Sequence, residues 1–288
     1  MLQIANKSNK HYSPLRYPGG KSCLSQFLTR VIETNKLTDC IYVEPYAGGA
    51  GAALTLLLLE KVERIIINDL DAAIFSFWKS IVENSGKFMR KIERVDLTMD
   101  EWSKQREIYR SKSKDTFKLG FATFYLNRTN RSGIIEGGAI GGANQTGEWG
   151  IDARFNREGL IERIKKIALY KNRIEITNND GIKLINSLKN RENTFIYLDP
   201  PYFVKGSSLY LNHYKQQNHC DLADVLNKNS KMRWILTYDN VVEIAALYPQ
   251  RQSYEFCLNY HADIPKKGKE LLILSDRIKL PSEYLSNN

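Results

Sequence analysis

Short apolar runs recur along the chain, and most are followed by glycine, asparagine or aspartate. The first run covers residues 41–44 and leads through a glycine-rich turn, residues 45–51, into an Ala/Leu-rich segment that predicts a helix to about Lys61. The second run, residues 64–68, is continuously apolar at its centre and ends at Asp69. Later runs predict further strands at residues 173–177, 195–198, 234–238, 254–258 and 270–274.

The alternation of these strands with helical stretches predicts the fold class. Such alternation is typical of α/β proteins, in which helices cover both faces of a largely parallel sheet. We therefore expect a Rossmann-like, doubly wound mixed sheet. A lysine-rich turn, residues 264–269, joins the last two strands, so we expect these to form an antiparallel hairpin.

The alternation stops between about Asp71 and Phe155. The first part of this segment is basic and predicts helices, and residues 127–150 form a loop rich in Gly, Asn and Thr. We predict an inserted, mostly helical domain at residues 72–155 between the two parts of the sheet domain, residues 1–71 and 156–288. A disordered lid would also fit the glycine-rich loop. Packing is favoured by Trp149, Ile134, Ile135 and Phe155.

The charge of the chain indicates the class of its partner. The formal net charge is +10, and the pI is near 9.3. This excess favours a polyanion such as nucleic acid, although an evenly basic surface would also explain it. Basic residues cluster between Lys104 and Lys114 with the aromatic Tyr109 among them, which favours a binding face.

Other sequence features narrow the location of the protein. No apolar run approaches the roughly 20 residues that cross a bilayer, and the N-terminus lacks the apolar core of a signal peptide. We expect a cytoplasmic protein without membrane contact. Its cysteines are widely spaced, which fits reduced thiols. His213, His219 and Cys220 lack a second ligand pair at zinc spacing, so we expect loop or surface positions and no metal.

The tetrapeptide Asp199-Pro200-Pro201-Tyr202 follows an apolar run and is the most informative motif of the chain. Two prolines fix two φ angles and remove two backbone donors, which leaves carbonyl oxygens free to accept hydrogen bonds. These acceptors, the Asp199 carboxylate and an aromatic face suit a planar amino group. A plain turn at the end of a strand is the alternative interpretation.

The glycine-rich turn after the first run predicts a nucleotide-like ligand. Glycines let backbone amides approach a ligand, and the next helix directs its positive end towards it. Asp69 follows about twenty residues later, which is the spacing of a ribose-binding acid in a βαβ unit. The turn lacks a clean GxGxxG pattern, so packing of helix against strand would explain it equally well.

Together these motifs resemble the Dam-like, D12 class of adenine-specific N6 DNA methyltransferases over nearly the whole chain. Residues 16–21 (RYPGGK) resemble the family's N-terminal aromatic-x-Gly-Gly-Lys element, and residues 43–49 (VEPYAGG) its Glu-Pro-aromatic-x-Gly element. Asp69 and Asp180 resemble the acids after the second and third strands, and residues 199–202 the catalytic tetrapeptide. The resemblance implies the class I methyltransferase fold, with residues 72–155 as the target-recognition domain.

The resemblance also implies that S-adenosyl-L-methionine is the methyl donor. The implied cofactor-binding residues are Tyr17, Gly19, Gly20, Lys21, Glu44, Pro45, Tyr46, Gly48, Gly49, Asp69 and Asp180. In this scheme Asp69 accepts the ribose hydroxyls and Asp180 accepts from the adenine amine. As alternatives, Lys21 could be solvated or hold a phosphate, and Asp180 could cap a helix that begins near Ile182.

The implied reaction is methylation of a flipped-out adenine in duplex DNA. The adenine rotates out of the stack, Tyr202 stacks on it, and Asp199 with the carbonyl of Pro200 accepts the N6 hydrogens. The lone pair of this amine is delocalised, so orientation and polarisation provide the catalysis, and the methyl group transfers directly in line. No metal is required.

The implied DNA-binding residues are Arg16, Asn127, Arg128, Arg131, Ser132 and Glu136. Enzymes that read GATC carry the pattern Asn-Arg-x-x-Tyr-Asn-Gly-Leu-x-Arg, but here arginine replaces the aromatic residue, serine the amide and glutamate the last arginine. Arginine can grip guanine and glutamate can accept from cytosine, so we expect a target other than GATC.

The alternatives to a site-specific DNA enzyme are an RNA adenine-N6 methyltransferase and a catalytically silent DNA-binding protein. The intact residues Asp199, Tyr202 and Asp69 count against the silent protein. We expect a monomer, since one cofactor site and one recognition domain suffice for one transfer. A bacterial or phage origin and a cognate restriction nuclease are consistent with this family.

Overall fold

The computed structural model describes residues 2, 11–17, 20–203, 214–260 and 266–285. Its strands are β1 (Ile41–Glu44), β2 (Arg64–Asn68), β3 (Ile174–Thr177), β4 (Thr194–Leu198), β5 (Arg233–Asp239), β6 (Ser253–Tyr260) and β7 (Lys266–Leu274). Its α-helices are α1 (Ser25–Thr34), α2 (Gly51–Leu58), α3 (Ala72–Glu83), α4 (Ser85–Arg94), α5 (Met99–Arg110), α6 (Thr116–Thr129), α7 (Arg157–Leu169), α8 (Gly181–Leu188), α10 (Gln216–Lys228) and α11 (Val242–Leu247). Short 3-10 helices are η1 (Lys21–Leu24), η2 (Arg131–Gly133), η3 (Lys171–Arg173) and η4 (Ser282–Tyr284).

Within the described residues, seven strands form one mixed sheet in the order β3-β2-β1-β4-β5-β7-β6. Strands β1 to β5 are parallel, and β7 is antiparallel to both β5 and β6. The predicted strands and the closing hairpin are therefore confirmed, with shifts of one to a few residues at their ends. Chain order reverses beside β1, whose neighbours are β2 and β4. A crevice for ligands is expected at the carboxyl ends of the strands at such a point.

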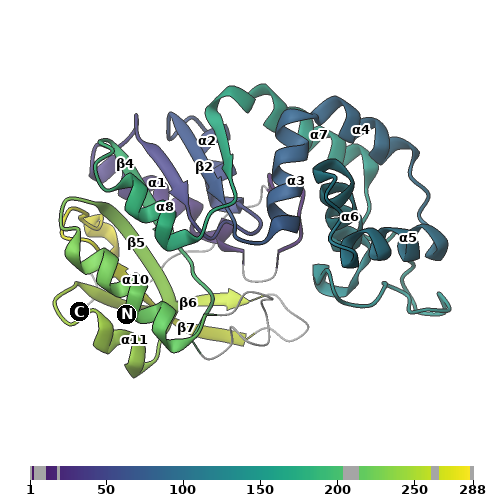
Figure 1. Ribbon diagram of the computed structural model, residues 1–288. Coiled ribbons are helices and arrows are strands. Elements are labelled where there is room, and N and C mark those ends of the chain that lie inside the picture. Colours follow the sequence, from purple (N-terminus) through teal and green to yellow (C-terminus); the bar gives the residue numbers. More distant parts are fainter. Residues whose placement is uncertain (1, 3–10, 18–19, 204–213, 261–265, 286–288) are drawn as a thin grey trace.

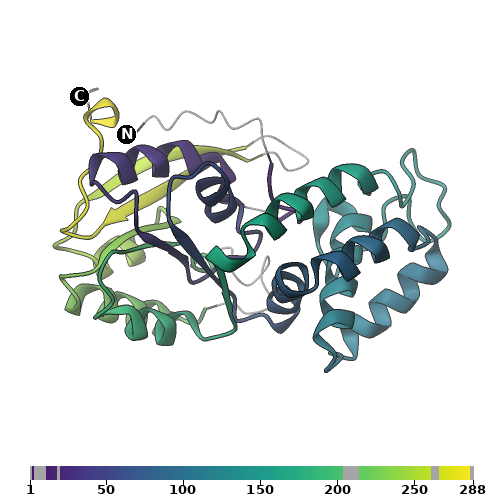
Figure 2. The same ribbon diagram turned by 90° about the horizontal axis from the view of Figure 1, so that it is seen from above.

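Strand β4 shows why the sheet is covered on both faces. Its side chains alternate, so Phe195 and Tyr197 pack in the core that contains α1 and α2, while Ile196 and Leu198 pack with α8 and α10. Figures 1 and 2 show these helix pairs on opposite sides of the sheet. A parallel strand that is buried on both faces is continuously apolar. The predicted doubly wound α/β fold is confirmed.

Helices α3 to α6 form a helical unit beside the sheet (Figure 1). Its core is aromatic: the ring of Phe88 lies 5.3 Å from the rings of both Phe121 and Phe124, measured between centroids. This core is continuous with that of the sheet, because Leu54 of α2 and Ile67 of β2 belong to the same cluster. Helix α7 packs against α2, α3 and α4, so it contacts both parts of the chain.

The segment after α6 is irregular but packed. Phe155, Ala139 and Ile151 are buried, whereas Trp149 and Ile134 are exposed. The alternative of a disordered lid is therefore wrong, although the residues expected to anchor the segment only partly do so. Phe155 provides the anchor, because its ring packs against Phe124 at a centroid distance of 5.5 Å.

The predicted loop or surface position is wrong for His219. It lies in α10 and is buried, with Nδ1 2.7 Å from the hydroxyl oxygen of Tyr238. Three aromatic rings pack around its imidazole, those of Phe203, Tyr214 and Tyr238. His213 lies outside the described residues. No helix in the described part of the chain is long and apolar enough to cross a membrane.

Helices α3 and α6 approach closely at Gly120. A Cβ atom on Gly120 would lie only 2.3 Å from the carbonyl oxygen of Ser76. We predict that Gly120→Ala lowers the free energy of unfolding by about 2 kcal/mol or more, because backbone must shift to relieve the overlap.

Gly86→Ala is the control, since a Cβ there meets only the Arg90 side chain at 3.6 Å. Higher helix propensity should stabilise this variant by up to about 1 kcal/mol. Urea unfolding measures the free energy of unfolding of both variants. An equal change in this free energy in the two variants would contradict the prediction.

Candidate functional site

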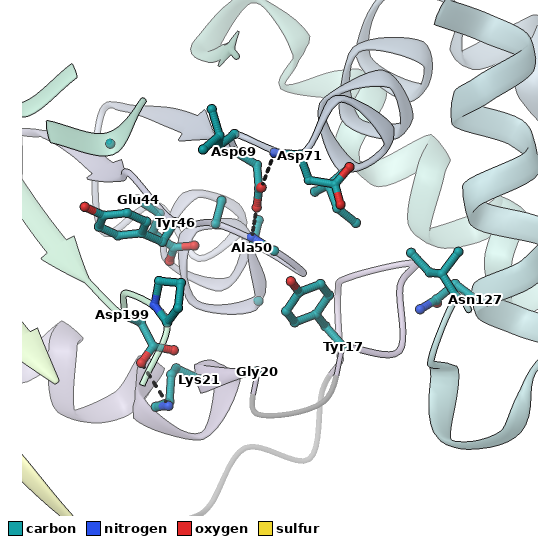
Figure 3. Close-up of a pocket in the computed structure, with 18 of the residues that line it drawn as sticks. Tyr17, Gly20, Lys21, Glu44, Tyr46, Ala50, Asp69, Asp71, Asn127 and Asp199 are labelled. Carbon is teal, nitrogen blue, oxygen red and sulfur yellow. Dashed lines mark hydrogen bonds and ion pairs between the residues drawn. The ribbon is translucent and has the colours of Figure 1, made fainter. Parts of the chain in front are cut away.

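A cavity of about 360 Å³ lies where β1, β2 and β4 end and faces the helical unit (Figure 3). Predicted residues that line it are Tyr17, Gly20, Lys21, Glu44, Tyr46, Gly48, Asp69, Asn127, Glu136, Asp180, Asp199 and Pro201. Predicted residues that do not line it are Arg16, Pro45, Gly49, Arg128, Arg131, Ser132, Pro200 and Tyr202. Gly19 lies outside the described residues. The structure thus unites most of the predicted cofactor residues with the first residue of the tetrapeptide.

The glycine turn after β1 allows close contact with Tyr17. Gly48 has a φ of +46°, and a Cβ there would lie 2.5 Å from the Tyr17 ring. A Cβ on Gly49 would lie 2.7 Å from Cβ of Tyr17. Side chains at these positions would displace Tyr17 from the cavity wall. Both glycines therefore have a role, even though Gly49 does not line the cavity.

The Asp69 carboxylate is held by backbone amides at the edge of the cavity. It accepts hydrogen bonds from the N–H of Gly48 at 2.8 Å and from the N–H of Asp71 at 2.9 Å. Each carboxylate oxygen has two lone pairs, so Asp69 can accept further hydrogen bonds from a ligand. Burial raises the pKa of Asp69 to about 7, although the two amides favour the ionised form.

Asn68, for which the sequence predicted no role, connects the loops around the cavity. Its amide nitrogen donates to the carbonyls of Pro45 at 2.8 Å and Asn179 at 2.9 Å. Its amide oxygen accepts from the Thr177 hydroxyl at 2.8 Å and from the N–H of Asn179 at 2.9 Å. The side chain is completely buried. Asn68 therefore joins the ends of β1, β2 and β3.

Glu44 is a buried carboxyl at the end of β1. Its Oε1 accepts from the N–H of Ala53 at 2.9 Å and from the Tyr42 hydroxyl at 3.1 Å. Ala53 lies in the first turn of α2, where unpaired N–H groups favour an acceptor. Burial raises the pKa of Glu44 to about 8, against the effect of these hydrogen bonds.

Four polar side chains meet beside the cavity, and we call Lys21, Asp199, Tyr202 and Glu270 the charged cluster. Nζ of Lys21 donates to the Tyr202 hydroxyl at 2.6 Å and lies 3.1 Å from Oδ1 of Asp199. The Tyr202 hydroxyl in turn donates to Glu270. Lys21 is buried, so the alternative of a solvated lysine is wrong. Glu270 comes from β7 and was not predicted, because nothing near it in sequence marks it as part of a site.

Asp199 and Lys21 are the members of the charged cluster that line the cavity, and Asp199 is the carboxylate of the two. Its Oδ1 also accepts from the Thr237 hydroxyl at 3.1 Å, and Thr237 lies 2.9 Å from the Tyr197 hydroxyl. Burial raises the pKa of Asp199, whereas Lys21 and Thr237 lower it. Pro201 also lines the cavity and Pro200 is buried. The carboxylate is thus fixed in orientation at the cavity wall.

Asp180 and Tyr46 form another part of the wall. Oδ1 of Asp180 accepts from the N–H of Lys183 at 3.0 Å, so the expected cap of α8 is confirmed. Asp180 also lines the cavity, and its contact with a ligand stays a prediction. The Tyr46 hydroxyl accepts from the Tyr214 hydroxyl at 2.7 Å. Gly181 allows this arrangement, since a Cβ there would lie 2.5 Å from the Tyr46 ring.

Asn127 and Arg128 direct their polar groups into the protein. The Asn127 side chain accepts from the N–H of Arg16 at 2.7 Å and donates to the carbonyls of Arg16 and Gly133, both at 2.8 Å. Nε of Arg128 donates to the carbonyl of Pro14 at 2.7 Å. Burial and two nearby arginines lower the pKa of Arg128 to about 9. Both side chains position the N-terminal segment, and their contact with DNA stays a prediction.

The next asparagine, Asn130, organises the loop that follows α6. Its Oδ1 accepts from the indole N–H of Trp102 at 2.7 Å. Its Nδ2 donates to three loop carbonyls, those of Ile134, Ile135 and Gly137. Asn130 is completely buried. It was not predicted as a site residue, although a second asparagine three residues after Asn127 was a usable signal.

The loop held by Asn130 exposes three predicted DNA-binding residues. Arg131 and Ser132 are exposed outside the cavity, and Ser132 has a φ of +53°. Glu136 is also exposed but borders the cavity, with Oε2 3.8 Å from an Arg110 nitrogen. The same loop therefore connects an exposed polar surface with the cavity.

A family model described as D12 class N6 adenine-specific DNA methyltransferase matches residues 17–259. The matched range contains β1 to β5 and all of β6 except its last residue. A search of curated proteins found no significant match.

The hydrogen bonds of Asn130 generate a prediction about the loop. Asn130→Ala should increase amide hydrogen exchange over residues 131–140 by roughly tenfold or more, because three carbonyls and one indole N–H lose their partner. Hydrogen exchange with mass spectrometry measures this. Asn144→Ala, an exposed position in the same loop, is the control and should change little. Equal protection in both variants would contradict the role of Asn130.

Proposed function

The chain belongs to the D12 class N6 adenine-specific DNA methyltransferase family, and we propose that its cavity binds both the methyl donor and the target adenine. Members of this family methylate adenine in DNA with S-adenosyl-L-methionine as donor. The predicted resemblance and reaction are confirmed by the match. The residue roles and the assignment of domains given below are our proposals.

The cavity fits the proposed cofactor in size and chemistry. Its volume of about 360 Å³ lies within the range of small-molecule sites. We assign the ribose hydroxyls to Asp69, whose oxygens retain lone pairs, and the adenine amine to Asp180. Glu44 and the part of the glycine turn that lines the cavity are assigned to the methionine part. When bound, this cofactor supplies a methyl group activated by a sulfonium centre.

We assign the target amine to Asp199 and the carbonyl of Pro200. The observation that carries this assignment is a carboxylate fixed at the cavity wall by Lys21 and Thr237, with a proline beside it. These acceptors would hold both N6 hydrogens and direct the nitrogen lone pair towards the methyl group. The Tyr202 hydroxyl is engaged by Lys21 and Glu270. Stacking of the adenine on its ring stays a prediction.

Target recognition is assigned to residues 72–155, and within them to the loop after α6. The loop exposes Arg131 and Ser132 and brings Glu136 to the cavity. All three residues depart from the pattern of the enzymes that read GATC, which supports a different target. Arginine could contact guanine there, and glutamate could accept from the cytosine amine. We further propose that the protein is a bacterial or phage enzyme that acts as a monomer.

Incubation with S-adenosyl-L-methionine and unmodified genomic DNA tests this function, with N6-methyladenine mapped by single-molecule sequencing. We expect methylation at one sharp sequence motif. Asp199→Ala should lower it at least about 100-fold, because the amine loses its fixed acceptor, while cofactor affinity stays nearly unchanged. Asp224→Ala, an exposed acid in α10, is the control and should keep full activity. Unmarked DNA with intact cofactor binding would favour RNA as substrate or a silent DNA-binding protein.

The raised pKa of Asp69 predicts that cofactor affinity depends on pH. The ionised carboxylate is the better acceptor for ribose hydroxyls, and it is lost as the pH falls below about 7. The dissociation constant should therefore rise by up to about tenfold per pH unit below this point. Isothermal titration calorimetry measures it. The Asp69→Asn variant should bind the cofactor more weakly, and its dissociation constant should no longer rise as the pH falls below about 7. A pH dependence of cofactor affinity centred near pH 8, which comes from Glu44, should persist in this variant. An unchanged profile in the variant would refute the assignment.

A further inference from the structure

The charged cluster contains two carboxyl groups but one ammonium group. Nζ of Lys21 lies 3.1 Å from Oδ1 of Asp199 and 3.6 Å from Oε1 of Glu270. The exposed fractions of the Lys21 and Glu270 side chains are 4% and 1%, so water screens these charges little. When both acids are ionised, the cluster therefore carries one negative charge beside the cavity.

Glu270 lies away from the cavity wall, behind Lys21 and Tyr202. Its Oε1 accepts from the Tyr202 hydroxyl, and its Oε2 is buried and accepts no hydrogen bond from the described residues. A buried acceptor without a partner is costly, so a merely structural position would favour an apolar or fully paired side chain. The ionisable groups that face Glu270 are Lys21, Cys23, Tyr197, Asp199 and Tyr202.

Methyl transfer to an amine releases one proton. As the N6 lone pair forms the new C–N bond, the C–S bond breaks and its electron pair returns to sulfur. N6 then carries a positive charge until an N–H bond breaks and leaves its electron pair on nitrogen. Asp199 is the carboxylate that lines the cavity, and it is therefore the nearest acceptor in the charged cluster.

We propose that Asp199 takes the N6 proton and that Glu270, by sharing Lys21, keeps Asp199 basic enough to do so. This inference rests on the proposed function of the cavity. A carboxylate that holds an ammonium alone is a poor proton acceptor, because the ion pair favours its ionised form. A second carboxylate on the same ammonium weakens that preference. After the transfer, Lys21 remains paired with Glu270, and the cluster is neutral.

The direction of the pH dependence follows from this arrangement. Burial raises the pKa of Glu270 to about 7 and also raises the pKa of Asp199, and the two acids titrate as a pair. Below about pH 7 the pair holds a proton, so Asp199 loses its capacity to accept another. The rate of methyl transfer should therefore rise as the pH increases through neutrality.

Two substitutions should move this midpoint in opposite directions. Glu270→Gln keeps an acceptor for Tyr202 but removes the charge, so the midpoint should fall by roughly one pH unit and the plateau rate by roughly tenfold. Lys21→Met removes the shared cation, so the midpoint should rise by roughly one pH unit. Glu270→Asp keeps the charge, so its midpoint and its plateau rate should stay close to those of the wild type. Glu255→Gln, an exposed acid on β6, is the control.

The measurement is the single-turnover rate of methyl transfer to DNA at saturating S-adenosyl-L-methionine, from about pH 5.5 to about pH 9. Circular dichroism shows whether each variant folds. If only one of Glu270→Gln and Lys21→Met folds, the direction in which its pH midpoint shifts is sufficient to test the proposal. A rate lowered equally at every pH, with an unchanged midpoint, would overturn the proposal and leave Glu270 a structural role. Failure of the proposed function is distinguishable, because the wild type itself would then not methylate DNA.

Discussion

The buried side chain of Asn68 is the interaction on which the geometry of the cavity depends. It forms four hydrogen bonds that join the ends of three adjacent parallel strands. The glycine turn, Asp69 and Asp180 lie in the three loops that follow these strands. Loops at the end of a sheet are free to vary, so a fixed connection between them sets the distances across a ligand site. One amide group performs this task because it donates twice and accepts twice.

The segment from Arg16 to Lys21 connects the parts of the molecule that must act together. Its first residue is bound through backbone to Asn127 of the helical unit, and Tyr17 packs on the glycine turn. Lys21 ends the segment in the charged cluster with Asp199. The elements that we assign to DNA, cofactor and target amine therefore share one short stretch of chain.

The sheet could be predicted from the sequence because its parallel strands are buried on both faces and are continuously apolar. Motifs whose partners are close in sequence were also found, as with the glycine turn or the cap at Asp180. Asn68 and Glu270 were missed because their partners come from distant segments, and a lone polar residue gives no local signal. His219 was misplaced for the same reason, since it lies in α10 whereas its polar partner Tyr238 lies in β5. Asn130 was missed although its three carbonyl partners are close in sequence.

The continuous core between the sheet and the helical unit has a consequence for engineering. Helix α3 starts at the edge of the cavity, packs on α6 at Gly120 and contributes to the same apolar cluster as β2. A chimera that exchanged residues 72–155 between relatives as a block would cut through this cluster and lose its complementary packing. The loop anchored by Asn130 meets the core at few positions and projects its polar side chains outward. Under the role that we propose for this loop, grafting it alone offers a route to new sequence specificity on an unchanged scaffold.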